Sequence, residues 1–244
     1  AARLLVKHGA NVRVTDSGTK PEIAEEGEKL TQFGVQVETG THSKEFLRGI
    51  DFIVISPGVP DSCPVISWAR EDLLPVISEI ELASRFARAP IIAITGTNGK
   101  TTTTSLIAHI LNENGIKSAA CGNIGRPLSS VVVELKDLAY IVCEVSSFQL
   151  ERIVRFQPHI SVFINLTPDH LDRYPSMRAY QAAKMNIFQN QDDTDWAIAN
   201  ESCAGFLRET LEKRKINTIY FNKDRSGLAR LFMEEGTLYI NLHN

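Results

Sequence analysis

Short apolar runs alternate with segments of helical periodicity along most of this chain. Most of the runs are continuously apolar, as expected of strands that are buried on both faces of a parallel sheet. One helix is predicted from Pro21 to Gly34, with proline near its first turn and glycine past its end. This alternation predicts a layered α/β fold with a mostly parallel sheet. The candidate strands are residues 12–14, 35–38, 52–56, 76–77, 91–94, 141–145, 161–165, 196–199 and 237–241.

A second helix is predicted at residues 101–114, directly after the strand at 91–94. Its apolar residues recur at helical spacing, so we expect them to share one face. The residues assigned to that face are Leu106, Ile107, Ile110 and Leu111.

Both ends of the chain look cut. A helical pattern at residues 1–8 stops at Gly9 and leads into a strand that is followed by Asp16. That order is the second half of a βαβ nucleotide-binding unit, whose first strand and Gly-rich turn would precede residue 1. At the other end, the residues from Ile216 onward are predicted to form a β-rich hairpin with its turn at 234–237. We therefore expect a piece of a longer protein.

A polar stretch at residues 85–90 separates two series of strands and helices. We place a domain boundary there. Residues 1–88 are expected to form a Rossmann-like domain that lacks its first strand and Gly-rich loop. Residues 89–244 are expected to form a P-loop ATPase-type central domain that is incomplete at its C-terminus.

Composition and charge exclude several classes of protein. The 244 residues include 26 Lys and Arg against 29 Asp and Glu, a balance that argues against a nucleic-acid coat. No apolar run approaches the roughly 20 residues of a membrane helix, and no signal peptide is recognisable. The four cysteines are far apart, so we expect neither a structural zinc site nor a disulfide framework. We expect a cytosolic protein.

The stretch at residues 91–102 carries the strongest chemical signal. A buried strand leads into Thr-Gly-Thr-Asn-Gly-Lys-Thr-Thr at 95–102 and then into a helix. Backbone N–H groups at such a turn bind phosphate, Lys100 adds positive charge, and the Thr101 hydroxyl suits Mg²⁺. Ile94 stands where the usual P-loop has its first glycine, and a turn that is rich in glycine for steric reasons alone is the alternative. The candidate ATP-binding residues are Gly96, Thr97, Asn98, Gly99, Lys100, Thr101 and Thr102.

Acidic and basic side chains follow two other predicted strands. Glu144 interrupts an apolar run, and a buried carboxylate is costly unless it is paired or binds a metal. We interpret it as a Mg²⁺ ligand; a helix cap or an ion pair with Arg152 is the alternative. After the strand at 161–165, one loop gathers two aspartates, an arginine and His170. Lys184 lies in a predicted helix, where solvent exposure would be the ordinary interpretation.

Five motifs together resemble the Mur ligase family. Beside the loop at 95–102 they are Gly-Asn-Ile-Gly at 122–125, Glu-Val-Ser-Ser-Phe-Gln-Leu-Glu at 144–151, Asn-Leu-Thr-Pro-Asp-His-Leu-Asp-Arg-Tyr-Pro at 165–175 and Tyr-Gln-Ala-Ala-Lys at 180–184. The Ser-Ser-Phe-Gln-Leu and Asp-His-Leu-Asp-Arg-Tyr strings are similar to the branch that adds D-glutamate to UDP-N-acetylmuramoyl-L-alanine. The resemblance implies a UDP-binding N-terminal domain, an ATPase domain and a C-terminal domain that this chain lacks.

The resemblance also implies a mechanism in peptidoglycan precursor synthesis. ATP would convert the substrate carboxylate to an acyl phosphate, which the amine of D-glutamate then attacks. Two Mg²⁺ ions are implied, one at Thr101 and Glu144 and the other at His170 and a carbamylated Lys184. The implied catalytic residues are Lys100, His170 and Lys184, and the implied substrate-binding residues are Asp16, Ser17, Ser56, Gly58, Asn123, Ser146 and Gln149.

Three alternatives remain open. One is another amino-acid ligase of the Mur or folylpolyglutamate type. Another is a P-loop NTPase without ligation, which would not need His170, Lys184 and a UDP-binding domain together. The third is a non-catalytic UDP-sugar-binding module, which would have no reason to keep Lys100 and Glu144. We expect a monomer with no nucleic-acid or membrane partner.

Overall fold

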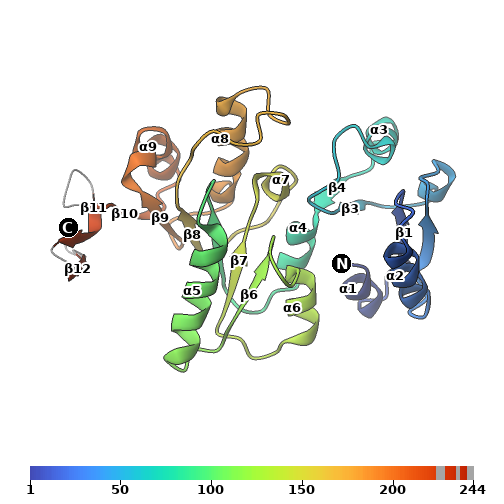
Figure 1. Ribbon diagram of the computed structural model, residues 1–244, viewed down its shortest axis with the longest axis horizontal. Coiled ribbons are helices and arrows are strands. Elements are labelled where there is room, and N and C mark those ends of the chain that lie inside the picture. The colour runs from blue at the N-terminus through green and yellow to red at the C-terminus, as the bar shows by residue number, and fades with distance from the viewer. Residues whose placement is uncertain (224–228, 235–236, 241–244) are drawn as a thin grey trace.

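The computed structural model describes residues 1–223, 229–234 and 237–240. Helices and strands alternate through most of the chain (Figure 1). The helices are α1 (Ala2–Lys7), α2 (Pro21–Thr31), α3 (Pro64–Glu71), α4 (Glu79–Ser84), α5 (Lys100–Glu113), α6 (Leu128–Glu134), α7 (Ser147–Leu150), α8 (Met177–Met185) and α9 (Ala204–Lys213), with short 3-10 turns η1 (Glu45–Leu47), η2 (Asn186–Phe188) and η3 (Glu201–Cys203). The strands are β1 (Arg13–Asp16), β2 (Gln36–Thr39), β3 (Ile53–Ile55), β4 (Val76–Ser78), β5 (Ile91–Thr95), β6 (Ser118–Gly122), β7 (Tyr140–Glu144), β8 (Ile160–Phe163), β9 (Trp196–Asn200), β10 (Asn217–Phe221), β11 (Ala229–Glu234) and β12 (Thr237–Ile240).

Eight of these strands form one large sheet in the order β12-β11-β10-β9-β8-β5-β7-β6. Its neighbouring strands are parallel except for the antiparallel pair β11 and β12. The wholly buried strand β5 lies between β7 and β8, so the carboxyl ends of three strands meet at one edge. The predicted α/β fold with a mostly parallel sheet is confirmed.

The N-terminal strands form two smaller sheets, one of β1 with β2 and one of β3 with β4, both parallel. Figure 1 shows them with α1, α2 and α3 on the side of the molecule beyond α6. The amino group of Ala1 donates to Ser129 Oγ of α6 at 2.8 Å. Leu4 of α1 is buried in the same cluster as Leu128, so this helix packs on the central part of the chain.

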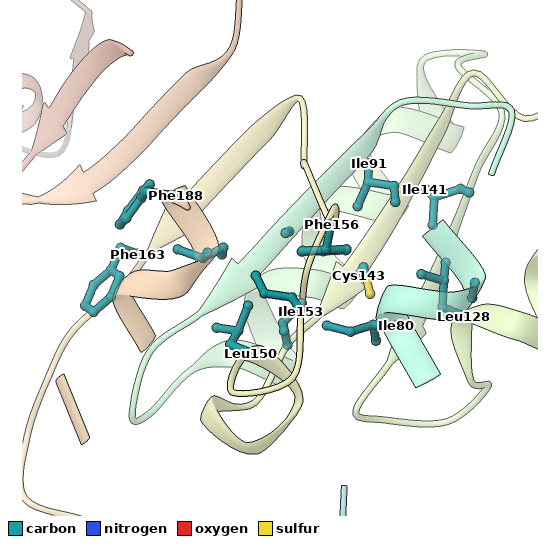
Figure 2. Close-up of a cluster of buried hydrophobic side chains, with 14 of the residues drawn as sticks. Ile80, Ile91, Leu128, Ile141, Cys143, Leu150, Ile153, Phe156, Phe163 and Phe188 are labelled. Carbon is teal, nitrogen blue, oxygen red and sulfur yellow. The ribbon is translucent and has the colours of Figure 1, made fainter. Parts of the chain in front are cut away.

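Two hydrophobic clusters cover the two faces of the large sheet. Alternate residues of β5 point to opposite faces, so Ile91 belongs to the larger cluster and Ile92 to the smaller one under α5. Figure 2 shows the larger cluster, in which Ile91, Ile141 and Leu128 pack together. Cys143 is fully buried there, as expected of a core residue.

A buried carboxylate ties α4 to the central part of the chain. Glu81 is inaccessible to solvent, and its Oε2 accepts hydrogen bonds from the amides of Val154, Arg155 and Phe156 at 2.9, 2.9 and 2.8 Å. Its Oε1 accepts from the Arg85 guanidinium at 2.9 and 2.7 Å. Burial alone would raise the pKa of this carboxyl, but the five hydrogen bonds outweigh burial and hold the pKa below its ordinary value.

Two details of the sequence interpretation change. Of the four residues assigned to one apolar face of α5, Ile107 and Leu111 pack against the smaller cluster, but Leu106 and Ile110 are about half exposed, at 53% and 50%. Thr104 and Ala108 are buried instead. Strand β6 was not predicted, because its sequence Ser-Ala-Ala-Cys-Gly consists of small residues and is not a strongly apolar run. Of the predicted hairpin turn at 234–237, residues 235–236 lie outside the described residues. In the described part of the chain, no helix combines the length and apolarity needed to cross a bilayer.

Candidate functional site

The candidate site lies where β5, β7 and β8 end. The register of the sheet places Ile94 beside Glu144 and Thr95 beside Phe163. The segments that follow these three strands therefore meet at the edge where open α/β sheets bind ligands. We call residues 96–99 the phosphate loop and residues 164–176 the β8 loop.

Two glycines give the phosphate loop its shape. Gly96 has φ 153°, and a Cβ there would lie 3.1 Å from Ile164 Cβ. Gly99 has φ 82° and is the N-cap of α5. The amides of residues 100–102 then fall in the first helical turn, where N–H groups have no intrahelical acceptor. Such a turn is suited to bind an anion.

Glu144 joins two of the predicted site residues. It is 2% exposed, its Oε2 accepts from Thr101 Oγ1 at 2.8 Å, and its Oε1 accepts from Asn123 Nδ2 at 3.1 Å. A hydroxyl and a carboxylate at the start of a phosphate-binding helix are the oxygen donors that Mg²⁺ takes beside nucleotide phosphates. These residues therefore fit a magnesium–nucleotide site.

The other interpretations of Glu144 do not hold. Ser146, not Glu144, caps the next helix, α7. Arg152 pairs with Asp61 rather than with Glu144. The Glu144 carboxylate instead accepts hydrogen bonds from Thr101 and Asn123 at the edge of the sheet.

Two lysine side chains donate hydrogen bonds to backbone carbonyls of the phosphate loop. Lys100 Nζ donates to the carbonyl of Thr97 at 2.8 Å, and Lys184 Nζ donates to the carbonyl of Gly96 at 2.7 Å. Lys184 is 2% exposed and lies over the Tyr180 ring, 4.7 Å from its centroid. The interpretation of Lys184 as an ordinary exposed lysine is therefore wrong.

Burial changes the chemistry of Lys184. Burial lowers its pKa, and the like charge of Lys100 lowers it further, to about 7, although Asp169 and Glu144 act in the opposite direction. A large fraction of the amine is then uncharged at neutral pH. The neutral amine is the nucleophilic form of a lysine.

His170 lies on the β8 loop in a left-handed conformation, with φ 53°. Its ring lies 4.9 Å from the Phe148 ring and 5.9 Å from the Tyr180 ring, centroid to centroid. Its Nε2 is 3.6 Å from Asp169 Oδ2. Across the described ranges, no three His, Cys, Asp or Glu side chains are grouped closely enough to hold a metal ion.

Ser146 and Gln149 contact each other at the start of α7. They form a capping box, in which the Gln149 amide donates to Ser146 Oγ at 3.3 Å and the Ser146 amide donates to Gln149 Oε1 at 2.9 Å. Gln149 is 2% exposed. The predicted contact of both residues with substrate stays a prediction.

The four N-terminal site residues line one large cavity of about 1230 Å³. It lies between β1 and β3, and the four residues are Asp16, Ser17, Ser56 and Gly58. Asp16 Oδ1 accepts from the amide of Gly18 at 2.7 Å, so this aspartate caps the turn that follows β1. This hydrogen bond uses only one carboxylate oxygen of Asp16. Binding of substrate by Asp16 therefore stays a prediction.

Sequence reasoning missed two residues that shape the site. Gly122 ends β6 at φ 104°, and a Cβ there would lie 2.2 Å from the carbonyl oxygen of Glu144. Asn165 accepts hydrogen bonds from the amides of Thr97 and Asn98. Gly122 and Asn165 are the first residues of the motifs at 122–125 and 165–175. The motifs alone do not show which distant backbone groups these residues contact.

The fold is similar to that of solved ligase structures. A UDP-N-acetylmuramate:L-alanyl-gamma-D-glutamyl-meso-diaminopimelate ligase from Neisseria meningitides superposes with a TM-score of 0.60 at 20% identity, covering 90% of this chain and 72% of that one. A murein peptide ligase from Psychrobacter arcticus gives 0.59 at 22% identity, covering 99% and 56%. At this identity the likeness concerns the fold alone.

Curated relatives are more similar in sequence. The UDP-N-acetylmuramoylalanine–D-glutamate ligase of Koribacter versatilis is 43% identical over 242 residues, 98% of this chain and 52% of the relative. That of Desulfatibacillum aliphaticivorans is 41% identical over 237 residues, 97% and 52%. The chain thus spans about half the length of the curated relatives it matches.

Two family models match the chain. The model of the Mur ligase MurD-like, N-terminal domain matches residues 1–78. The model of the Mur ligase middle domain matches residues 94–238, more than half of the chain. The chain therefore belongs to the Mur ligase family.

Proposed function

We propose that the edge of the large sheet binds Mg-ATP and that the whole protein adds D-glutamate to UDP-N-acetylmuramoyl-L-alanine. The observation that carries the proposal is the buried Glu144 carboxylate, which accepts from Thr101 and Asn123 at the start of α5. Identity of 43% and 41% to two ligases that bear this activity in their names supports the choice of substrates.

Thr101 and Glu144 are the residues that would hold the first Mg²⁺. A bound Mg²⁺ supplies positive charge that neutralises the phosphates of the nucleotide. Lys100 adds a further positive charge from the first turn of α5 itself. Together these groups suit a reaction in which two anions, a carboxylate and a triphosphate, must approach each other.

His170 and Lys184 are the residues assigned to a second Mg²⁺. An ammonium group cannot bind Mg²⁺, so Lys184 must first be carbamylated. In that step the neutral amine attacks CO2, a nitrogen–carbon bond forms, and a proton is released. The lowered pKa of Lys184 supports this chemistry, because it supplies the neutral amine at neutral pH.

The proposed reaction has two steps. A carboxylate oxygen of the substrate attacks the γ-phosphorus of ATP, and ADP leaves. The amine of D-glutamate then attacks the acyl carbon, loses a proton, and phosphate leaves to give the amide. Asn123, Ser146 and Gln149 are assigned to the substrate near its reacting end.

The N-terminal part of the chain is assigned to the UDP portion of the substrate. The cavity between β1 and β3 is lined by Asp16, Ser17, Ser56 and Gly58, and its volume of about 1230 Å³ is large enough for a nucleotide. Residues 1–88 would be the UDP-binding domain and residues 89–244 the central ATPase domain, with amino-acid selectivity in a further domain. We infer a cytoplasmic monomer.

Titration of the purified 244-residue chain with ATP in the presence and absence of Mg²⁺ tests the nucleotide half of this proposal. We expect heat of binding with Mg²⁺ and its loss in Lys100→Ala, while Lys213→Ala on the exposed end of α9 binds like the wild type. Equal binding by wild type and Lys100→Ala would reject the site.

A further inference from the structure

Asn165 carries a set of contacts that the proposed reaction does not explain. It follows β8 and opens the motif that leads to His170. Its Oδ1 accepts from the amide of Thr97 at 3.0 Å and from the amide of Asn98 at 2.9 Å. Its Nδ2 donates to the carbonyl of Asn98 at 3.1 Å. One side chain thus satisfies three backbone groups of a loop that is 67 and 68 positions away in sequence.

Further hydrogen bonds join the same two segments. The Thr97 amide also donates to the Asn165 carbonyl at 3.1 Å. Thr97 Oγ1 donates to the carbonyl of Thr167 at 3.1 Å and accepts from the Thr167 amide at 3.0 Å. Asn98 Nδ2 donates to Thr167 Oγ1 at 3.4 Å. Residues 97 and 98 are therefore joined to residues 165 and 167 by both side-chain and backbone hydrogen bonds.

These contacts divide the phosphate loop into two halves. In the first half, the amides of Thr97 and Asn98 are already used by Asn165. In the second half, Gly99 turns the chain at φ 82° into α5. The amides of residues 100–102 that follow have no intrahelical acceptors. The amides of residues 100–102 can therefore be offered to an anion without giving up an intrahelical hydrogen bond, whereas those of Thr97 and Asn98 would have to leave Asn165.

We propose that Asn165 is a positioning residue, which fixes residues 97–98 to the β8 loop so that the first turn of α5 is preorganised for the nucleotide phosphates. This inference rests on the proposed nucleotide site and adds a residue to it. It also implies that the phosphate loop and the segment that carries His170 form one unit. Fixing a loop in advance increases affinity because ordering costs no longer oppose binding.

The chain offers a matched control at the other end of the same helix. Asn112 Oδ1 accepts from the Ser118 amide at 2.9 Å, and its Nδ2 donates to the carbonyls of Ala108 and Ser118 at 2.7 and 3.2 Å. Asn112→Ala thus removes as many side-chain bonds to backbone as Asn165→Ala does. A loss of stability alone would affect both variants alike.

Hydrogen exchange of backbone amides tests the contact without any nucleotide. In Asn165→Ala we expect the amide of Asn98 to exchange at least about fivefold faster than in the wild type, the equivalent of one lost hydrogen bond. The amide of Thr97 keeps its hydrogen bond to the Asn165 carbonyl and should change less. Asn165→Asp keeps an acceptor oxygen and should restore protection to within about twofold. Asn112→Ala should leave both amides unchanged. Unchanged exchange in Asn165→Ala, or no recovery in Asn165→Asp, would overturn the proposal.

Titration with Mg-ATP then tests the consequence for binding. We expect Kd to rise at least about fivefold in Asn165→Ala and to stay within about twofold of wild type in Asn112→Ala. If the wild type binds no nucleotide, the proposed function fails, and the exchange data still decide whether Asn165 fixes the loop. If the wild type binds and Asn165→Ala binds equally well, the positioning role is rejected and the proposed function stands.

Discussion

Thr101 and Glu144 lie 43 positions apart, and the Thr101 hydroxyl donates to Glu144 Oε2 at 2.8 Å. One residue begins a helix and the other ends a buried strand, so the contact depends on the register of β5 and β7. Both hydrogen-bond partners of this buried carboxylate, Thr101 and Asn123, are neutral. Such an arrangement favours a cation at the same place.

Glu144→Gln should therefore remove most of the Mg²⁺ dependence of nucleotide binding. Glutamine keeps the size of the side chain and can still accept from Thr101, but it carries no charge. We expect the affinity for Mg-ATP to fall at least about tenfold, while the melting temperature changes little. Calorimetric titration with and without Mg²⁺ measures this. Retention of full Mg²⁺ dependence in Glu144→Gln would contradict the assignment, and Glu209→Gln on the exposed face of α9 is the control.

Gly122→Ala should displace the strand end that carries Glu144. A Cβ at Gly122 would lie 2.2 Å from the Glu144 carbonyl oxygen, and φ is 104° there. Gly125→Ala is the matched control, because Gly125 also has positive φ, at 58°, but open space around its Cβ position. We expect Gly122→Ala to be less stable than Gly125→Ala by about 1–3 kcal/mol, from the steric clash. Equal urea midpoints for the two variants would show that β6 can move away at little cost.

Lys184 should take up CO2. With its pKa lowered to about 7, the neutral amine is abundant at neutral pH, so a carbamate can form. Carbon-13 NMR of the chain in labelled bicarbonate should show a carbamate signal that Lys184→Arg lacks and that Lys213→Arg on the surface keeps. A signal that survives in Lys184→Arg, or no signal in the wild type, would refute the carbamate.

Glu81 should make stability depend on pH in the acid range. Its folded-state pKa is lowered, so its contribution is complete above the ordinary carboxyl value of 4.5 and is lost as pH falls through the folded-state pKa. Glu81→Gln loses that contribution at every pH and should cost about 3 kcal/mol at neutral pH. Denaturation from pH 7 downward should show the difference between wild type and Glu81→Gln shrinking. A constant difference would contradict the linkage, and Glu209→Gln should follow the wild type.

The parts of the site that could be predicted are those whose residues lie close together in the sequence. Lys100 and Thr101 follow a strand and a glycine turn within a few residues, and a lone Glu144 in an apolar run is conspicuous. The contacts of Asn165 and the burial of Lys184 depend on how distant strands align in the sheet. Hydrophobic spacing alone likewise could not tell that the α5 face bearing Thr104 and Ala108 packs inward.

The most direct test of the ligase assignment is phosphate release by the whole protein with Mg-ATP and UDP-N-acetylmuramoyl-L-alanine across a panel of amino acids. We expect release that depends on D-glutamate and is lost in Lys100→Ala. Release that depends on a different amino acid would keep the mechanism but contradict the substrate. Steady release with no amino acid present would contradict ligation and favour a simple NTPase.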